Sequence, residues 1–168
     1  PHPIPEAAQK NRWRAVLGIG SWPEASLKLS AVDVSEGATR LFDRSQDAAI
    51  EAAVAASTAI PGLHAPITVD DHRYMDGGVA GAHIDVAQGY GTVIAIVTGG
   101  GAAARQQVDS LRSAGARVAL ISPDAQSAAT VGADRFVMSQ VKPSAESGLR
   151  QAAAVADEVR NVWSGTTS

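Results

Sequence analysis

Residues 92–121 of this 168-residue chain read TVIAIVTGGGAAARQQVDSLRSAGARVALI, and this stretch decides the fold class. Residues 92–97 form a continuous apolar run, which is typical of a strand covered on both faces. A helix is expected after the glycines, through Leu111, with Gly115 ending it. Residues 117–121 repeat the first pattern. A strand, a helix and a second strand at these intervals indicate an α/β layer with a parallel component.

Two helices are expected downstream of this unit. The first covers residues 125–131. The second is amphipathic, because apolar side chains recur at helical spacing along one stripe near the end of the chain. The stripe consists of Leu149, Ala152, Ala156, Val159 and Trp163.

Upstream, the pattern predicts antiparallel strands and two helices. A short helix over residues 6–17 ends at Gly18. Residues 27–34 alternate apolar and polar side chains and turn into residues 39–42, which predicts a hairpin. The run over residues 48–56 is apolar nearly all round and predicts a buried helix.

The ends of that buried helix have their own signals. Ser45 is the expected N-cap, with Asp47 in the first turn. Pro61 forces the chain out of the helix. Two short strands then flank the turn 70–72, and a sharp glycine turn follows at 76–78.

These elements together predict an α/β protein. Its sheet should be mixed and partly parallel, with helices on both faces, and residues 1–168 should form a single domain.

Composition excludes several classes of site. The net charge is −3 and the 14 Lys and Arg residues are scattered, so no nucleic-acid partner is expected. Without cysteine the chain has no disulfide, thiolate metal ligand or cysteine nucleophile. No apolar run approaches the roughly 20 residues that span a bilayer, and no signal peptide is recognisable at the start. We therefore expect a cytoplasmic protein, and no cofactor.

Two sequence motifs carry chemistry. Residues 52–62 read AAVAASTAIPG, an alanine-rich helix followed by an A-S-x-A-I-P turn, and residues 74–79 read YMDGGV. The pair, with Pro66-Ile67 between them, resembles the second signature region of the patatin-like phospholipases and esterases. In that family a short hairpin after the helix delivers a D-G-G or D-G-A motif. The order and the loop length agree here.

The resemblance covers most of the chain. Upstream, Trp22-Pro23 and residues 27–37 are similar to the family's W-P and L-x-x-x-A-V-D-x-x-x-G strand pair. Downstream it extends to the strand at Thr92 and to the closing helix at Val162-Trp163. The family's glycine-rich oxyanion loop and G-x-S-x-G nucleophile elbow are not found, since no G-x-S-x-G occurs in residues 1–168. We therefore expect this chain to be the C-terminal portion of a patatin-like domain.

The resemblance implies a Ser-Asp dyad, in which an aspartate accepts the proton of the attacking serine. Asp76 matches that aspartate. Gly77 and Gly78 shape the turn, because glycine lets backbone pass close by without a Cβ. The serine would come from an upstream segment. The alternative for an isolated D-G-G is an ordinary turn, but the preceding signature favours the catalytic interpretation.

Other candidate groups are weaker. Ser57 has alanine neighbours at a helix end and no elbow, so its hydroxyl should bond to backbone. Ser21 is followed by Trp22-Pro23, where a small residue and a helix should come. The glycines 99–101 could hold an anion, but they lack P-loop and dinucleotide spacing, which favours a plain connection.

A metal site and a lipid contact are the last two candidates that the sequence offers. The histidines at 64, 72 and 83, with Asp70 and Asp71, match no metal-ligand spacing. Arg12, Trp13 and Arg14 could touch anionic lipid, although an exposed helix face explains them equally well.

Two functions remain open from sequence. The first is hydrolysis of carboxylic esters, in phospholipids or smaller acyl esters, with the chain inactive alone. The second is a non-catalytic α/β binding or interaction module on a patatin-like scaffold. An anion- or nucleotide-binding domain built on the Gly99 loop is weaker. A truncated sheet would also leave an apolar edge uncovered, so we expect the chain to bind its missing half or form a homo-oligomer.

Overall fold

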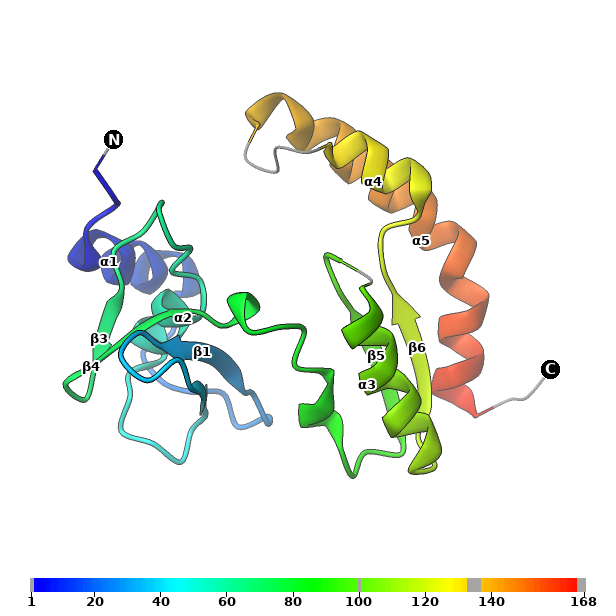
Figure 1. Ribbon diagram of the computed structural model, residues 1–168, viewed down its shortest axis with the longest axis horizontal. Helices are drawn as coiled ribbons and strands as arrows, with labels where there is room; N and C mark the ends of the chain where they lie inside the picture. The colour runs from blue at the N-terminus through cyan, green and yellow to red at the C-terminus, as the bar shows by residue number, and fades with distance from the viewer. Residues whose placement is uncertain (1, 100, 133–136, 166–168) are drawn as a thin grey trace. The chain divides into compact units, whose positions relative to one another are not determined.

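The computed structural model describes residues 2–99, 101–132 and 137–165. The chain divides into two compact units, Pro1–His83 and Ile84–Ser168, which are described in turn (Figure 1). The expectation of one domain over residues 1–168 stays a prediction.

The first unit is built on a four-stranded antiparallel sheet of order β2-β1-β4-β3. The strand β1 (Leu29–Asp33) pairs with β2 (Thr39–Phe42) on one side and with β4 (His72–Asp76) on the other. The hairpin partner of β4 is β3 (Ile67–Val69). Both predicted hairpins are therefore confirmed, and the antiparallel pairing of β1 with β4 joins them.

Two helices complete the first unit: α1 (Glu6–Leu17) and α2 (Ile50–Ser57). The helix α2 contacts β1, β3 and β4, and its alanines at 53, 55 and 56 are fully buried, as its apolar sequence predicts. Phe42 and Tyr74 meet edge to face beneath it, with ring centroids 5.0 Å apart. Alanine side chains let the helix backbone approach the sheet closely.

The predicted cap of α2 is wrong. The helix begins at Ile50 with Ala49 as N-cap, and no side chain caps it. The Ser45 hydroxyl instead donates to the Asp43 carboxylate at 2.6 Å, which closes a local turn before the helix starts. A serine beside an aspartate has a nearer acceptor than the helix terminus offers it.

The tip of the β3–β4 hairpin is a left-handed turn. Asp70 and Asp71 have φ values of 49° and 63°. Aspartate tolerates this region better than most residues, which explains why two of them occupy the tip. His72, expected in the turn, is the first residue of β4.

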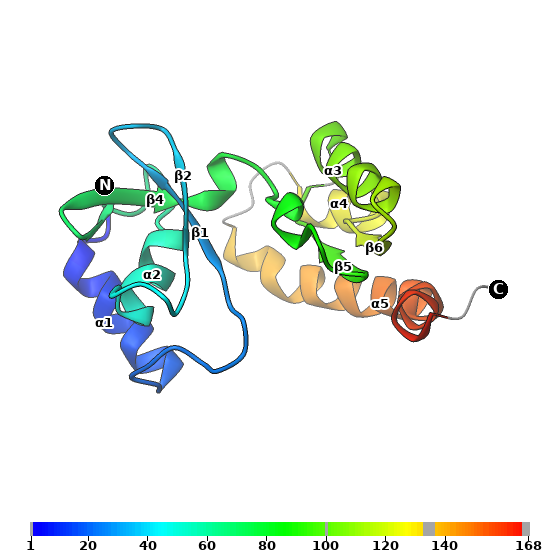
Figure 2. The same cartoon turned by 90° about the horizontal axis from the view of Figure 1, so that it is seen from below.

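The second unit holds the parallel pair. The strands β5 (Thr92–Ile96) and β6 (Arg117–Ile121) run parallel, and α3 (Ala102–Ser113) connects them. Figure 2 shows α3 and α5 (Val141–Ser164) on opposite faces of this sheet. Val108 and Leu111 of α3 pack on Ala95 and Val118. Helices thus cover both faces, as predicted.

The α/β class is confirmed, but hydrogen bonds place the described strands in two sheets rather than in one mixed sheet. The antiparallel strands close among themselves in the first unit. The parallel strands pair only with each other in the second. Sequence patterns identify strands but carry no information on which strands share hydrogen bonds.

Short helices fill the connections. These are the 3-10 helices η1 (Gly77–Val79), η2 (Ile84–Ala87) and η3 (Met138–Gln140), and the short α-helix α4 (Ala125–Val131). The last helix, α5, is longer than its apolar stripe predicted. Leu149 and Trp163 of that stripe are exposed, whereas Ala156 and Val159 line a groove against the sheet.

A polar cluster fastens α4 to α5. Asp124 caps α4 by accepting from the Ser127 N–H at 2.7 Å, and it also accepts from Arg150 of α5 at 2.6 Å. The buried hydroxyls of Ser127 and Ser147 lie 3.0 Å apart. Hydrogen bonds from Arg150 lower the pKa of Asp124 from 3.8 to about 2, with the Ser127 N–H contributing.

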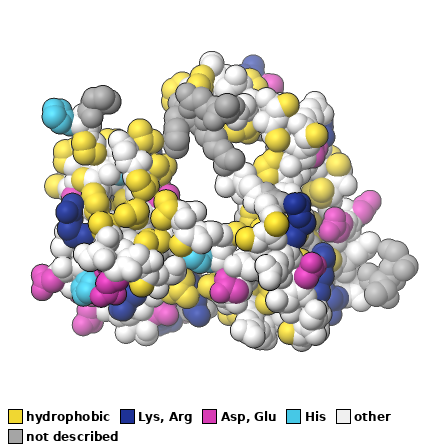
Figure 3. Space-filling view, in the orientation of Figure 1, with side chains coloured by type: hydrophobic (Ala, Val, Ile, Leu, Met, Phe, Trp, Pro, Cys, Tyr) yellow, Lys and Arg dark blue, Asp and Glu magenta, His cyan; other side chains and the backbone are white. Residues whose placement is uncertain are grey.

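No helix among residues 2–99, 101–132 and 137–165 is long and apolar enough to cross a membrane. On the face shown in Figure 3, acidic and basic side chains lie among hydrophobic ones on each unit.

The Asp124 cluster predicts an acid-sensitive contribution to stability. Because the folded-state pKa is depressed, the stabilisation is present above pH ~4 and is lost as the pH falls towards ~2. Asp124→Asn keeps a capping oxygen but loses the charge. The difference in unfolding free energy between wild type and Asp124→Asn should therefore shrink from pH 5 to pH 2, measured by urea unfolding at each pH.

Asp109→Asn is the matched control, because this carboxylate is 72% exposed and lies 3.7 Å from Arg112. It should change stability little at any of these pH values. A wild-type advantage over Asp124→Asn that is constant from pH 5 to pH 2 would contradict the assigned role of the Asp124 charge.

Candidate active site

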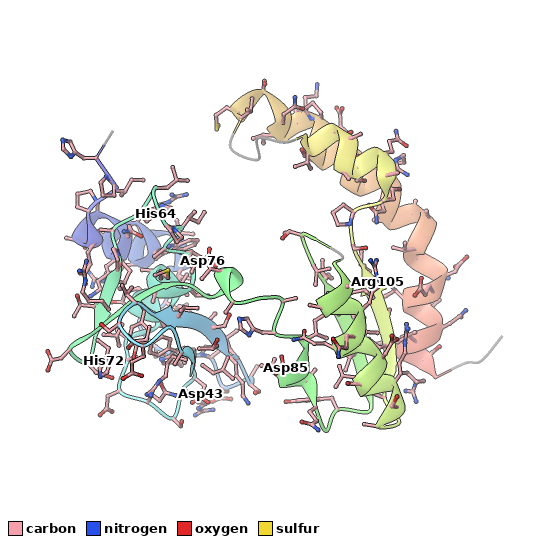
Figure 4. All side chains as sticks on the ribbon, in the orientation of Figure 1. Asp43, His64, His72, Asp76, Asp85 and Arg105 are labelled. Atoms are coloured by element: carbon pink, nitrogen blue, oxygen red, sulfur yellow. The ribbon has the colours of Figure 1, made fainter. Side chains whose placement is uncertain are left out.

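Asp76 stands where the two sequence motifs meet. It is the last residue of β4, and its neighbour across the sheet is Ala31 of β1. Its backbone N–H donates to the Ala59 carbonyl at 3.0 Å, so the A-S-x-A-I-P turn and the D-G-G turn are bonded directly. Figure 4 shows Asp76 and His72 at opposite ends of the same strand.

The carboxylate of Asp76 is held at one oxygen. Its Oδ1 accepts from the Gly78 N–H at 2.7 Å, which caps η1. The residue is partly buried, and Oδ2 has no hydrogen-bond partner among the described residues. One carboxylate oxygen is therefore fixed in orientation while the other is free to accept a proton or a hydrogen bond.

Gly77 has no room for a side chain. A Cβ at this position would lie 2.3 Å from the Ser30 Oγ and 2.4 Å from the Ser30 carbonyl oxygen of β1. The backbone of the turn must pass this close because Asp76 pairs with the adjacent strand. Glycine is thus required at 77 by packing.

His83 supports the turn from the other side. Its Nε2 lies 2.9 Å from the Gly77 carbonyl oxygen, an arrangement in which the ring N–H donates. His83 itself has a φ of 50°, which is uncommon for a residue with a side chain. Sequence reasoning placed His83 only in a possible metal cluster, and no local pattern signals its contact with Gly77.

The end of α2 is fastened by a different histidine. The Nδ1 of His64 accepts from the Ile60 N–H at 3.2 Å. The hydroxyl of Thr58 donates to the Val54 carbonyl at 2.7 Å, the kind of bond that we expected from Ser57. Ser57 is the last residue of α2 and is partly buried, in a setting without a nucleophile elbow.

A third histidine pairs with a buried carboxylate at the far end of β4. His72 Nδ1 lies 2.7 Å from Asp33 Oδ2, while Asp33 Oδ1 accepts from the Ser35 and Glu36 N–H groups. The hydrogen bond from His72, followed by the two backbone N–H groups, lowers the pKa of Asp33 despite burial. The pair locks the start of β4 to the end of β1, and sequence reasoning missed it.

The remaining candidates do not gather at Asp76. Among the described residues, no group of three or more His, Cys, Asp or Glu side chains could hold a metal ion. Ser21 lies in an exposed bend. Gly101 precedes α3 in an extended conformation, and Gly100 lies outside the described residues.

The basic residues of α1 have structural partners. Arg14 forms an ion pair with Glu51 of α2 at 2.9 Å, and Arg12 lies over the Trp13 ring at 5.7 Å. An exposed helix face accounts for both. The anionic-lipid contact considered from the sequence gains no support from this arrangement.

The fold and this turn define an α/β protein that presents a carboxylate on a glycine turn beside a buried helix end. Residues 9–86 match the family model described as patatin-like phospholipase. This segment, which contains Asp76, is similar to the patatin-like phospholipases. A search of curated proteins found no match to the chain.

The match contains every residue of the site described above, from Ser30 to His83. It ends before β5, so the family resemblance noted at Thr92 and at Val162-Trp163 stays a prediction. The residue-level roles of Asp76, Gly77 and Gly78 are likewise predictions.

Gly77→Ala tests the packing of the turn. The new methyl group would meet backbone atoms of Ser30, which cannot move without disturbing β1, so we expect a loss of about 1–3 kcal/mol of unfolding free energy. Denaturant unfolding followed by circular dichroism measures this loss.

Gly20→Ala is the control, because nothing lies within 4 Å of a Cβ built there. It should leave stability within about 0.5 kcal/mol of wild type. Equal stability of the two variants would mean that Gly77 does not approach Ser30 in solution.

Proposed function

We propose that this protein hydrolyses carboxylic esters, of phospholipids or of smaller acyl esters, with Asp76 as the general base of a Ser-Asp dyad. Asp76 would take the proton from a serine hydroxyl as that oxygen attacks the acyl carbonyl. It would then return the proton to the leaving alcohol, and in a second step it would take a proton from the water that releases the acyl group and give it back to the serine. Gly77 and Gly78 would serve the reaction by shaping the turn that holds the carboxylate.

The observation that carries the proposal is how hydrogen bonds hold the Asp76 carboxylate. One oxygen is anchored by the Gly78 N–H at 2.7 Å, and the residue's own N–H is bonded to the helix end at Ala59. A carboxylate is a weak base, so its usefulness depends on being held in one place at little reorganisation cost. The free Oδ2 is the atom proposed to face the serine.

The nucleophile is proposed to come from protein outside residues 1–168. These residues contain no G-x-S-x-G, and the serines at 21 and 57 occupy a bend and a helix end. The segment supplying the serine and its oxyanion loop would be encoded upstream. Residues 1–168 would then be the C-terminal portion of the catalytic domain and inactive by themselves.

Asp76→Asn in the complete protein tests the base. The amide keeps an oxygen that can accept from the Gly78 N–H but cannot accept a proton, so kcat for a p-nitrophenyl ester should fall by at least about 100-fold. Labelling of the serine by a fluorophosphonate should slow in parallel, because the same proton transfer activates it.

Asp71→Asn is the matched control on the same hairpin. Asn tolerates the left-handed backbone of that position as well as Asp does, so activity should be unchanged. Full activity of Asp76→Asn, or an upstream reading frame without G-x-S-x-G, would overturn the proposal. Either result would favour the non-catalytic binding or interaction module.

A further inference from the structure

A single peptide group connects His83 to Asp76. The Gly78 N–H donates to Asp76 Oδ1 at 2.7 Å. The carbonyl of the same peptide unit belongs to Gly77, and its oxygen lies 2.9 Å from His83 Nε2. Hydrogen bonds at the two ends of one amide polarise each other, so a donor at the carbonyl strengthens the N–H as a donor. The imidazole can therefore act on the Asp76 carboxylate without touching it.

The peptide between Gly77 and Gly78 needs a restraint of this kind. Glycines on both sides of a peptide have no Cβ to oppose a flip of its plane, which would exchange the directions of N–H and C=O. Such a flip would turn the Gly78 N–H away from Asp76. Two donors hold the Gly77 carbonyl against it: the Ala80 N–H at 3.1 Å and His83 Nε2. A carbonyl oxygen has two lone pairs, so both bonds can form together.

The backbone of His83 is bent to make this contact. Its φ of 50° lies in the left-handed region, which is unfavourable for a residue with a Cβ. Gly81, two positions earlier, has a φ of 136°. These two residues reverse the chain after η1, so the ring returns to a carbonyl six positions upstream. Residues in such conformations persist where a contact favours them, and they are frequent at functional sites.

The contact uses His83 as a hydrogen-bond donor. A carbonyl has no proton to give, so Nε2 must carry one. Both the neutral ring with the proton on Nε2 and the imidazolium ion satisfy this requirement. The hydrogen bond therefore depends on a donor at this position and not on a positive charge, and a neutral amide of similar reach is able to replace the ring.

We propose that His83 is a positioning residue for the hydrolysis. Through the Gly77 carbonyl it keeps the Gly78 N–H on Asp76 Oδ1, and so keeps Oδ2 directed at the serine. The inference rests on the proposed function, because it takes Asp76 as the base. In this assignment His83 neither accepts the serine proton nor contacts the substrate. A misplaced base slows the chemical step and leaves substrate binding intact, so the effect belongs in kcat rather than KM.

His83→Leu and His83→Gln in the complete protein test the inference. Both side chains meet the same backbone strain at φ 50°, but only the Gln amide brings an N–H donor to about the reach of Nε2. For a p-nitrophenyl ester, kcat of His83→Leu should fall about 10-fold with KM unchanged, and His83→Gln should stay within about 3-fold of wild type. Wild-type kcat in His83→Leu, or equal losses in both variants, would overturn the inference.

A double-mutant cycle with Asp76→Asn identifies the route of the effect. If His83 acts through the Asp76 carboxylate, adding His83→Leu to Asp76→Asn should cause no further loss of kcat, because the base is already absent. A further loss of about 10-fold in the Asp76→Asn background would show that His83 acts on the rate by another route, and would also overturn the inference.

The Gly78 amide gives a measurement that does not depend on activity. Its proton is bonded to Asp76 Oδ1 and should exchange slowly with solvent in the wild type. In His83→Leu we expect exchange at least about 10-fold faster, and in His83→Gln exchange at the wild-type rate, followed by NMR of the complete protein. Equal exchange in His83→Leu and wild type would contradict a restraint on this peptide by His83.

The two proposals fail separately. A loss of about 100-fold in Asp76→Asn together with wild-type kcat in His83→Leu would sink only the role of His83. Full activity of Asp76→Asn would sink the catalytic assignment and the rate effect that depends on it. The exchange of the Gly78 amide would then still report whether His83 holds the peptide.

Discussion

The pairing of β4 with β1 is the constraint on which the first unit depends. It sets Asp76 opposite Ala31, brings the Gly77 backbone against Ser30, and carries Tyr74 into contact with Phe42. The Asp33–His72 pair locks one end of the strand. The bond from the Asp76 N–H to Ala59 locks the other. A strand held at both ends presents its terminal carboxylate in one orientation, which is what a weak base requires.

Sequence predicted the elements well where local chemistry decides them. Helix ends at Gly18 and Ser57, the hairpin tip at Asp70, and the buried alanine helix follow from glycine, proline and apolar patterning. The cap at Ser45 failed because Asp43 is the nearer acceptor. Sequence patterns predicted both antiparallel and parallel strands, but the division of these strands between two sheets depends on long-range contacts that periodicity does not record.

The candidate site was likewise predicted only in part from the sequence. The D-G-G turn can be predicted from the sequence, because Asp-Gly is a strong turn signal and the A-S-x-A-I-P motif precedes it in the same segment of the chain. The histidine contacts that hold the turn and its strand in place could not be predicted from the sequence. His83 reaches back to Gly77, and His72 reaches Asp33 across 39 positions of chain, so each histidine looks isolated when the sequence is read alone. The three histidines have three separate partners: the Ile60 N–H for His64, the Asp33 carboxylate for His72 and the Gly77 carbonyl for His83.

Tryptophan placement gives each unit a different optical signature. Trp13 and Trp22 pack against the core of the first unit, and the Trp22 indole N–H donates to the Ala48 carbonyl at 2.8 Å. Trp163 on α5 is 69% exposed. Unfolding of the first unit therefore exposes two partly buried indoles to water and shifts their fluorescence emission to longer wavelength. The Trp163 indole of the second unit is already exposed to water when that unit is folded. Intrinsic fluorescence thus follows the unit that carries Asp76 with little interference from its neighbour.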